Sequence, residues 1–183
     1  FIDDYEIYNL TIDYDLGFAS FVSSTSYSDR EHSNIIGQIL QFAPASSAPL
    51  GFLGSESREM TIFSQELRLS SASDESTEWT VGVFYKDADF SIIASNNFGG
   101  ADDNTESTQS LAVFGDIVRN VTDRMQVGIG VRYFEDDREF LDRAPVPDAT
   151  LSGNFDDITP RIYASYAMNE NVMIIIGKSI HVR

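Results

Sequence analysis

The side chains that could carry out chemistry are few and lie far apart. The chain has 183 residues, no cysteine and two histidines, His32 and His181. Transition-metal sites and Ser-His-Asp triads depend on His or Cys, so only these two positions could serve. No GxSxG nucleophile motif and no phosphate-binding glycine loop occurs. We therefore predict no enzymatic activity, no metal site and no cofactor.

An acidic stretch, "DDNTE" (Asp102 to Glu106), resembles the start of a calcium-binding loop. Position six of that loop would be Ser107 instead of Gly, and position twelve would be Val113 instead of Glu. The stretch therefore does not fit an EF-hand. We interpret it as a solvated acidic loop, with weak attraction of divalent cations as the alternative.

Charge and hydropathy exclude two further classes of protein. The 29 acidic and 12 basic side chains give a net charge of -17, which would repel a nucleic-acid backbone. The longest apolar run is "VMIIIG" (Val172 to Gly177), whereas a membrane-spanning helix needs ~20 residues. Nucleic-acid binding and a helical membrane protein are both disfavoured.

The dominant local pattern is a two-residue alternation of apolar and polar or small side chains. In the stretch from Met125 to Phe134, for example, Val127, Ile129 and Val131 alternate with glycine, glycine and arginine. This period predicts β-strands with one apolar face. We predict eight of them: Tyr5–Tyr14, Phe18–Arg30, Met60–Ser70, Glu78–Phe90, Ser107–Asn120, Arg124–Arg138, Asp156–Ala167 and Val172–Arg183.

The connections between these strands alternate in length. Short turns, such as "DLG" after Tyr14 and "VTD" after Asn120, are followed by long connections at Glu31–Arg58, Ser91–Glu106 and Glu139–Phe155. Transmembrane β-barrels have short turns on one side and long loops on the other, and their strands need ~9 to 11 residues to cross the bilayer. A soluble β-sandwich remains the alternative if the alternation has been misread.

Aromatic residues gather near both ends of the predicted strands, as in the girdles of membrane barrels. One set lies near the short turns and the other near the long connections. The first comprises Tyr14, Phe18, Trp79 and Tyr166, and the second Tyr5, Tyr27, Phe63, Tyr85, Phe90 and Tyr133.

Four ordered motifs resemble barrel hairpins of the TonB-dependent outer-membrane receptors. They are "FSQELRLSS" (Phe63 to Ser71), "WTVGVFY" (Trp79 to Tyr85), "LAVFGDIVRNVTDRMQVGIGVRYFEDDREF" (Leu111 to Phe140) and "FDDITPRIYASYAMNENVMI" (Phe155 to Ile174). The last segment, "GKSIHVR" (Gly177 to Arg183), departs from the family pattern and leaves the register of the final strand open.

The resemblance implies an all-β antiparallel barrel of about 22 strands closed around a plug. It also implies import of a scarce nutrient, such as an iron-siderophore complex, with energy from the TonB complex at the bacterial outer membrane. Residues 1–183 would be a middle segment of that barrel, without plug domain, TonB box or remaining strands. Its partners would be outer-membrane lipid, the other strands and plug, the TonB complex and the nutrient. A small passive porin-like or structural barrel is the alternative.

Two groups of residues are candidates for functional contacts. The first group lies on the polar side of the predicted strands and is expected to face the lumen, either in structural ion pairs or in contact with cargo: Glu66, Arg68, Gln126, Arg132 and Arg161. The second group lies in the long connections, which carry ligand contacts in many proteins: Phe52, Asp102, Asp103, Pro145 and Asp148.

Overall fold

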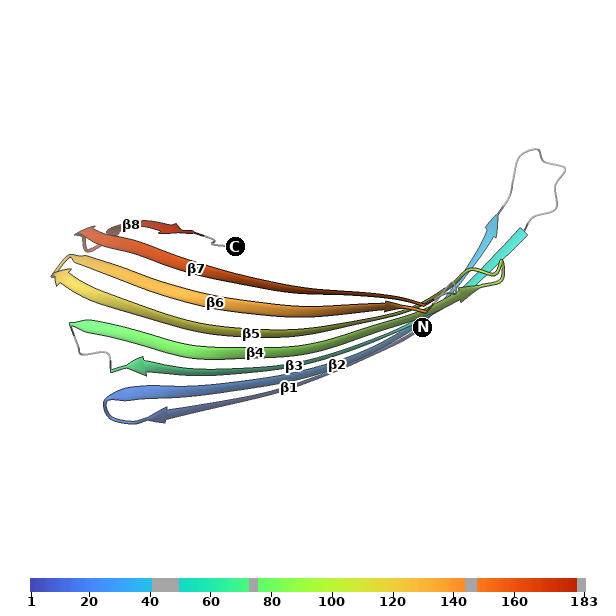
Figure 1. Ribbon diagram of the computed structural model, residues 1–183, viewed down its shortest axis with the longest axis horizontal. Coiled ribbons are helices and arrows are strands. Elements are labelled where there is room, and N and C mark those ends of the chain that lie inside the picture. Colours follow the sequence, from blue (N-terminus) through green and yellow to red (C-terminus); the bar gives the residue numbers. More distant parts are fainter. Residues whose placement is uncertain (41–49, 73–75, 144–147, 181–183) are drawn as a thin grey trace.

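The computed structural model of the chain is one curved, open β-sheet whose eight strands lie side by side in chain order (Figure 1). It describes residues 1–40, 50–72, 76–143 and 148–180. The strands are β1 (Ile2–Asp15), β2 (Ala19–Leu40), β3 (Leu50–Ser71), β4 (Thr77–Asn96), β5 (Ala101–Thr122), β6 (Met125–Asp142), β7 (Ala149–Asn169) and β8 (Val172–Ser179). All neighbouring strands pair antiparallel. Among these residues no helix is long and apolar enough to cross a membrane.

The register brings the alternating pattern of every strand into phase, so the sheet has two chemically different faces. For example, Val113 pairs with Tyr133 and Tyr133 with Ile158, all on the apolar face, whereas Phe114 pairs with Arg132 on the polar face. The apolar side chains are exposed, Ile129 by 61% and Ile162 by 58%, because the described part of the chain forms one layer. The all-β antiparallel fold predicted from the sequence is confirmed.

The apolar face carries a belt of mostly apolar side chains, four or five residues on each of β1 to β7 and two on β8. On β6 the belt runs from Val127 to Tyr133, which is about 20 Å at ~3.3 Å per residue. A barrel in a bilayer presents an apolar band of about 25 Å, so the belt covers most of that length along the strand. The belt comprises Tyr8–Tyr14, Phe21–Tyr27, Phe63–Leu69, Trp79–Tyr85, Leu111–Ile117, Val127–Tyr133, Ile158–Tyr166 and Ile174–Ile176, taking alternate residues.

An aromatic row borders the belt on the side of the long connections. It consists of Tyr8, Tyr27, Phe63, Tyr85 and Tyr133, and two of its ring pairs, Tyr8–Tyr27 and Phe63–Tyr85, have centroids 6.4 Å apart. Three of its hydroxyls donate to a carboxylate two residues further out, at Glu6, Asp87 and Glu135.

Two residues expected in this row lie elsewhere. Tyr5 pairs with Arg30, and Phe90 pairs with Met60 and Glu106, all on the polar face. The assignment was wrong because it considered only that both residues lie near a strand end. The face is set by the alternation along the strand, and a shift of one residue changes it.

The predicted long connections are mostly strand, which corrects the sequence analysis. β2 continues to Leu40, β3 begins at Leu50, and β4 and β5 are joined by a turn at Asn97–Gly100. Beyond the belt, backbone ladders pair these extensions, and their side chains do not alternate between apolar and polar. The period-two signal is therefore lost there although the strand continues. In Figure 1 the hairpin of β2 and β3 projects past its neighbours.

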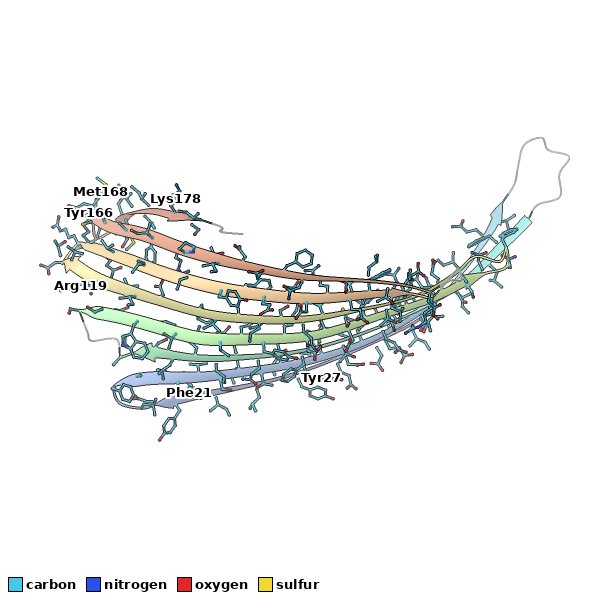
Figure 2. The ribbon with its side chains drawn as sticks, viewed as in Figure 1. Phe21, Tyr27, Arg119, Tyr166, Met168 and Lys178 are labelled. Carbon is cyan, nitrogen blue, oxygen red and sulfur yellow. The ribbon has the colours of Figure 1, made fainter. Side chains whose placement is uncertain are left out.

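The opposite end of the sheet carries the short turns, as expected. Arg119, Tyr166 and Met168 lie together at that end in Figure 2, close to the turns that join β5 to β6 and β7 to β8. β1 begins at the end of the long connections and β8 runs from the short turns toward it, as predicted. The predicted last strand, Val172–Arg183, was too long, since β8 ends at Ser179. Residues 181–183 of that prediction lie outside the described part of the chain.

Two polar features interrupt the apolar face. Gln65 bonds to the hydroxyls of Thr25, at 2.5 Å, and Ser23, at 3.0 Å, so these three groups satisfy one another. Lys178 pairs with Ile162 and so lies on the apolar face, which settles the register of the final strand in this structure. Nothing in the described residues explains a lysine at that position.

The phase of the belt can be tested by placing one charged side chain on the apolar face. In the intact protein reconstituted in phospholipid vesicles, Ile129→Lys should lower the free energy of unfolding by about 2–4 kcal/mol, because a membrane barrel would place this charge against lipid near the middle of the belt. Arg132→Lys, on the other face, is the control and should change stability little. Equal losses in a urea titration of the two variants would contradict the register.

Candidate functional site

All five residues predicted to face the lumen lie on the polar face of the sheet. Glu66 and Arg68 lie on β3 with their charged atoms 3.7 Å apart, and Gln126 on β6 donates to Asn120. The guanidinium of Arg132 lies 5.6 Å from the ring centre of Phe134. Their shared face follows from the register, whereas their role in the lumen stays a prediction.

Arg161 belongs to a three-residue cluster that spans β5, β6 and β7. Its Nε and Nη2 lie 3.0 Å and 2.9 Å from Oδ2 of Asp116, and the hydroxyl of Tyr163 donates to Oδ1 of the same carboxylate at 2.9 Å. Asp116 is on β5 and the other two residues are on β7, so these contacts pass over β6.

Glycines on β6 make this crossing possible. A Cβ at Gly128 would lie 2.1 Å from Cζ of Tyr163, and a Cβ at Gly130 would lie 2.3 Å from Oδ2 of Asp116. The same arrangement recurs on β4, where a Cβ at Gly82 would meet the ring of Phe114 at 2.3 Å. The sequence analysis missed this cluster, although the "GIG" at residues 128–130 was its signal, since glycine in a strand marks a close approach.

Large side chains lie flat along this part of the sheet and cover the small ones. Six of the seven described residues that are buried lie on the polar face of β5 and β6: Thr108, Ser110, Ala112, Gly128, Gly130 and Asp136. Burial in this sheet requires cover from neighbouring side chains, since the described residues form a single layer. The small residues of the polar face are therefore covered here by neighbouring side chains of the same face.

Asp136 is the most buried charged group of this face. Its side chain is 4% exposed, accepts a hydrogen bond from Ser110 at 2.5 Å and pairs with Nε of Arg138 at 2.6 Å. It lies beyond the aromatic row, outside the belt. Burial raises the pKa of Asp136, but the hydrogen bonds from Ser110 and Arg138 outweigh burial, and the pKa is lowered below its usual value.

A small cavity of about 200 Å³ lies on the polar face toward the long connections. Its lining comprises Arg30, His32, Arg58, Glu59, Met60 and Phe90. Each arginine is held by a carboxylate: Arg30 by Asp3, through two bonds of 3.0 Å, and Arg58 by Glu56 at 2.8 Å. A guanidinium has five N–H donors, so both arginines can offer further donors to a ligand.

The residues predicted to contact a ligand from the long connections are dispersed. Phe52 on β3 stacks on Phe98, with ring centres 6.0 Å apart. Asp103 on β5 pairs with Arg143 at 3.1 Å, whereas Asp102 and Asp148 are exposed. Pro145 lies outside the described residues. The structure does not bring these residues into one cluster.

Charge is divided unequally between the two faces. Seven of the twelve basic residues lie on the polar face: Arg30, Arg58, Arg68, Lys86, Arg132, Arg138 and Arg161. The apolar face continues past the aromatic row toward the long connections. Within the described strands, all charged residues of this outer part are acidic: Asp4, Glu6, Asp29, Glu31, Glu59, Asp87, Asp89, Asp103, Glu135, Asp137, Glu139 and Asp156. The negative net charge therefore resides largely on the side that faces away from the arginines.

Comparison with known proteins gives the family of the chain. The sequence profile described as TonB dependent receptor-like, beta-barrel matches residues 1–178, so the chain belongs to this family. Barrels of this family are outer-membrane proteins of Gram-negative bacteria. The comparison with curated proteins gives no match.

Solved structures share the fold at low sequence identity. The ferric yersiniabactin uptake receptor FyuA from Yersinia pestis aligns with a TM-score of 0.79 and 14% identity over 96% of this chain and 27% of its own. The siderophore receptor PiuA from Acinetobacter baumannii gives 0.76 and 12% over 96% and 32%. The copper transporter OprC gives 0.68 and 9% over 96% and 31%. The chain thus spans about a quarter to a third of these structures.

The glycine crossing can be tested by adding one methyl group. Gly128→Ala in the complete receptor should lower the free energy of unfolding by about 1–3 kcal/mol, because its Cβ would displace Tyr163 from Asp116. Gly115→Ala is the control, since a Cβ there meets Val81 at an ordinary 3.7 Å. It should be neutral or stabilising by up to ~1 kcal/mol. Equal effects of the two variants would contradict the crossing.

The buried carboxylate of Asp136 predicts a loss of stability in acid. Its folded pKa lies below the unfolded value, so its contribution is present above the unfolded pKa and is lost as the pH falls through the folded one. Asp136→Asn should therefore reduce the drop in stability between neutral pH and about pH 3. Thermal unfolding of the receptor at both pH values, with the exposed Asp148→Asn as control, measures this. An unchanged drop would show that Asp136 is not involved.

Proposed function

We propose that the chain is part of the wall of an outer-membrane receptor that binds a scarce nutrient, such as an iron-siderophore complex, and imports it with TonB-coupled energy. The observation that carries this proposal is the two-faced sheet, with an apolar belt across all eight strands on one side and a polar, arginine-bearing wall on the other. In a closed barrel the belt contacts lipid and the polar wall lines the lumen.

The rest of the receptor would supply what a transporter needs beyond this segment. The edges of the sheet, β1 and β8, each have unpaired backbone groups, which cost several kcal/mol per group in lipid. Other strands of the same barrel would pair with them, and a plug domain with a TonB-contacting segment would fill and operate the lumen. This requirement favours a receptor segment over a small independent barrel.

The cavity beside Arg30 and Arg58 is the best candidate for the first contact with cargo. It lies on the lumen side beyond the aromatic row, where a ligand from outside would arrive. Its arginine donors suit carboxylate or phenolate oxygens, and Phe90 and Met60 add apolar surface for the body of a chelate. Phe52, Asp102, Asp103, Pro145 and Asp148 remain candidates for further ligand contacts.

Transport can be tested with the complete receptor in a host that lacks its own ferric-siderophore receptors. Radiolabelled iron, supplied as a panel of siderophore complexes, should enter only when TonB is present. Arg58→Gln should weaken ligand binding by about 10- to 100-fold, the effect of losing a charged hydrogen bond. Lys86→Gln, on the same face outside the cavity, is the control.

The outcome without TonB separates the alternatives. Equal entry in strains with and without TonB would indicate a passive porin-like barrel. Unchanged affinity of Arg58→Gln would remove the cavity from the ligand site while leaving the transport proposal intact.

A further inference from the structure

A histidine lies in the wall of the cavity beside Arg30 and Arg58. By register His32 on β2 is paired with Asp3 on β1 and with Arg58 on β3, and all three residues lie on the polar face. His32 lines the cavity, and 22% of its side chain is exposed. An imidazole is therefore placed between a carboxylate and a guanidinium, at the position where we propose the first contact with cargo.

One nitrogen of this imidazole is left without a partner. Nδ1 of His32 is buried and has no hydrogen-bond partner among the described residues. Oδ1 of Asp3 lies 3.7 Å away, which is beyond hydrogen-bond distance. That oxygen accepts a bond from Nε of Arg30 at 3.0 Å, and Oδ2 accepts one from Nη2 of the same arginine at 3.0 Å. A carboxylate oxygen has two acceptor positions, so Oδ1 can also accept a bond from His32.

The charges around His32 balance while its ring is neutral. On this face, the other titratable or charged side chains of β2 and of its two neighbouring strands next to His32 are those of Asp3, Tyr5, Arg30, Glu56 and Arg58. Each arginine is paired with one carboxylate, so two positive charges offset two negative ones. Glu59 also lines the cavity, but by register it lies on the other face. A proton on His32 therefore gives the site a net positive charge.

We propose that His32 makes anion binding in this cavity depend on pH, with tighter binding when its ring is protonated. This inference rests on the proposed function, in which the cavity receives the anionic groups of the cargo. Histidine is the one side chain that ordinarily changes its charge between about pH 5 and 8. The neutral and the protonated form of the site are thus both reached under mild conditions.

Two effects of the proton act in the same direction. The imidazolium places a charged donor in the cavity wall, and anionic oxygens bind charged donors more strongly than neutral ones. Its Nδ1–H is also attracted to Oδ1 of Asp3, which then divides its acceptor positions between His32 and Arg30. Arg30 is held less tightly and can turn more of its N–H donors toward an anion. By linkage, a bound anion favours the protonated ring, so binding takes up protons.

Benzenesulfonate is a suitable probe, because it joins an aromatic ring to an anionic group that keeps its charge across the range in which histidine titrates, about pH 5 to 8. Its affinity for the intact receptor in detergent is measured by the broadening of its NMR signals. Binding should be about two- to fivefold tighter at about pH 5.5 than at about pH 8, the effect of one added, partly exposed charge. Calorimetry in two buffers with different heats of ionisation should show proton uptake on binding.

Substitutions at His32 separate its role from that of the arginines. His32→Asn removes the titrating ring and keeps a neutral polar side chain, so it should abolish the pH dependence and leave binding at high pH nearly unchanged. His32→Gln serves if the first variant does not fold. His181→Asn, at the chain's other histidine outside the described residues, is the matched control and should keep the pH dependence. Asp3→Asn should tighten binding at high pH, because Arg30 loses its partner.

The possible results distinguish this inference from the proposed function. Tighter binding at high pH, binding that does not change with pH, or a pH dependence that survives in both His32 variants would overturn the role of His32 and leave the cavity as a ligand site. Absence of binding at both pH values, or full binding by Arg58→Gln, would overturn the inference together with the assignment of the cavity. Absence of TonB-dependent uptake would overturn the transport function alone, and the pH dependence of benzenesulfonate binding would still stand.

Discussion

The phase of the two-residue alternation, held common to eight strands by their register, is the constraint on which the rest of the structure depends. Successive side chains of a strand point to opposite faces, so a slip of one residue in any strand would move its apolar side chains to the polar side. The pairing of Val113, Tyr133 and Ile158 across three strands shows the common phase. Both the belt and the arginine-bearing wall follow from this common phase, since each consists of the alternate residues of every strand that point to the same face.

A second consequence of the register is that glycines and large side chains come to lie beside each other. Gly128 and Gly130 are unremarkable within β6 alone, and so are Asp116 in β5 and Tyr163 in β7. Only when the three strands are in register do the carboxylate, the phenol and Arg161 meet over the glycines. The cluster then fixes the relative positions of β5 and β7, which share no backbone hydrogen bonds. Side-chain contacts thus add to the backbone ladder in resisting a slip.

This dependence explains how much could be predicted from the sequence. The strands that carry the belt were predicted, because lipid on one side and polar groups on the other impose alternation on residues such as Val127 to Tyr133. Strand extensions beyond the belt were taken for loops, because their side chains do not alternate between apolar and polar. Tyr5 and Phe90 were assigned to the wrong face, because their position along the strand was considered and the face to which each side chain points was not. The Asp116 cluster was missed because contacts across three strands require a register that no single strand contains.

The division of charge shows why the composition of the whole chain is a poor guide to its cargo. A net charge of -17 suggests repulsion of any anion, and it is a sound argument against nucleic acid, which would meet the whole surface. In the proposed barrel, a ligand entering the lumen would meet only the polar face. There Arg30, Arg58 and Arg161 are each paired with a carboxylate, so local charge is nearly balanced and individual N–H donors decide recognition. Acidic groups such as Glu135 and Asp156 lie on the other face, across the sheet from these donors. In the proposed receptor, affinity for an anionic chelate would therefore depend on the placement of a few guanidinium groups and is compatible with an acidic protein.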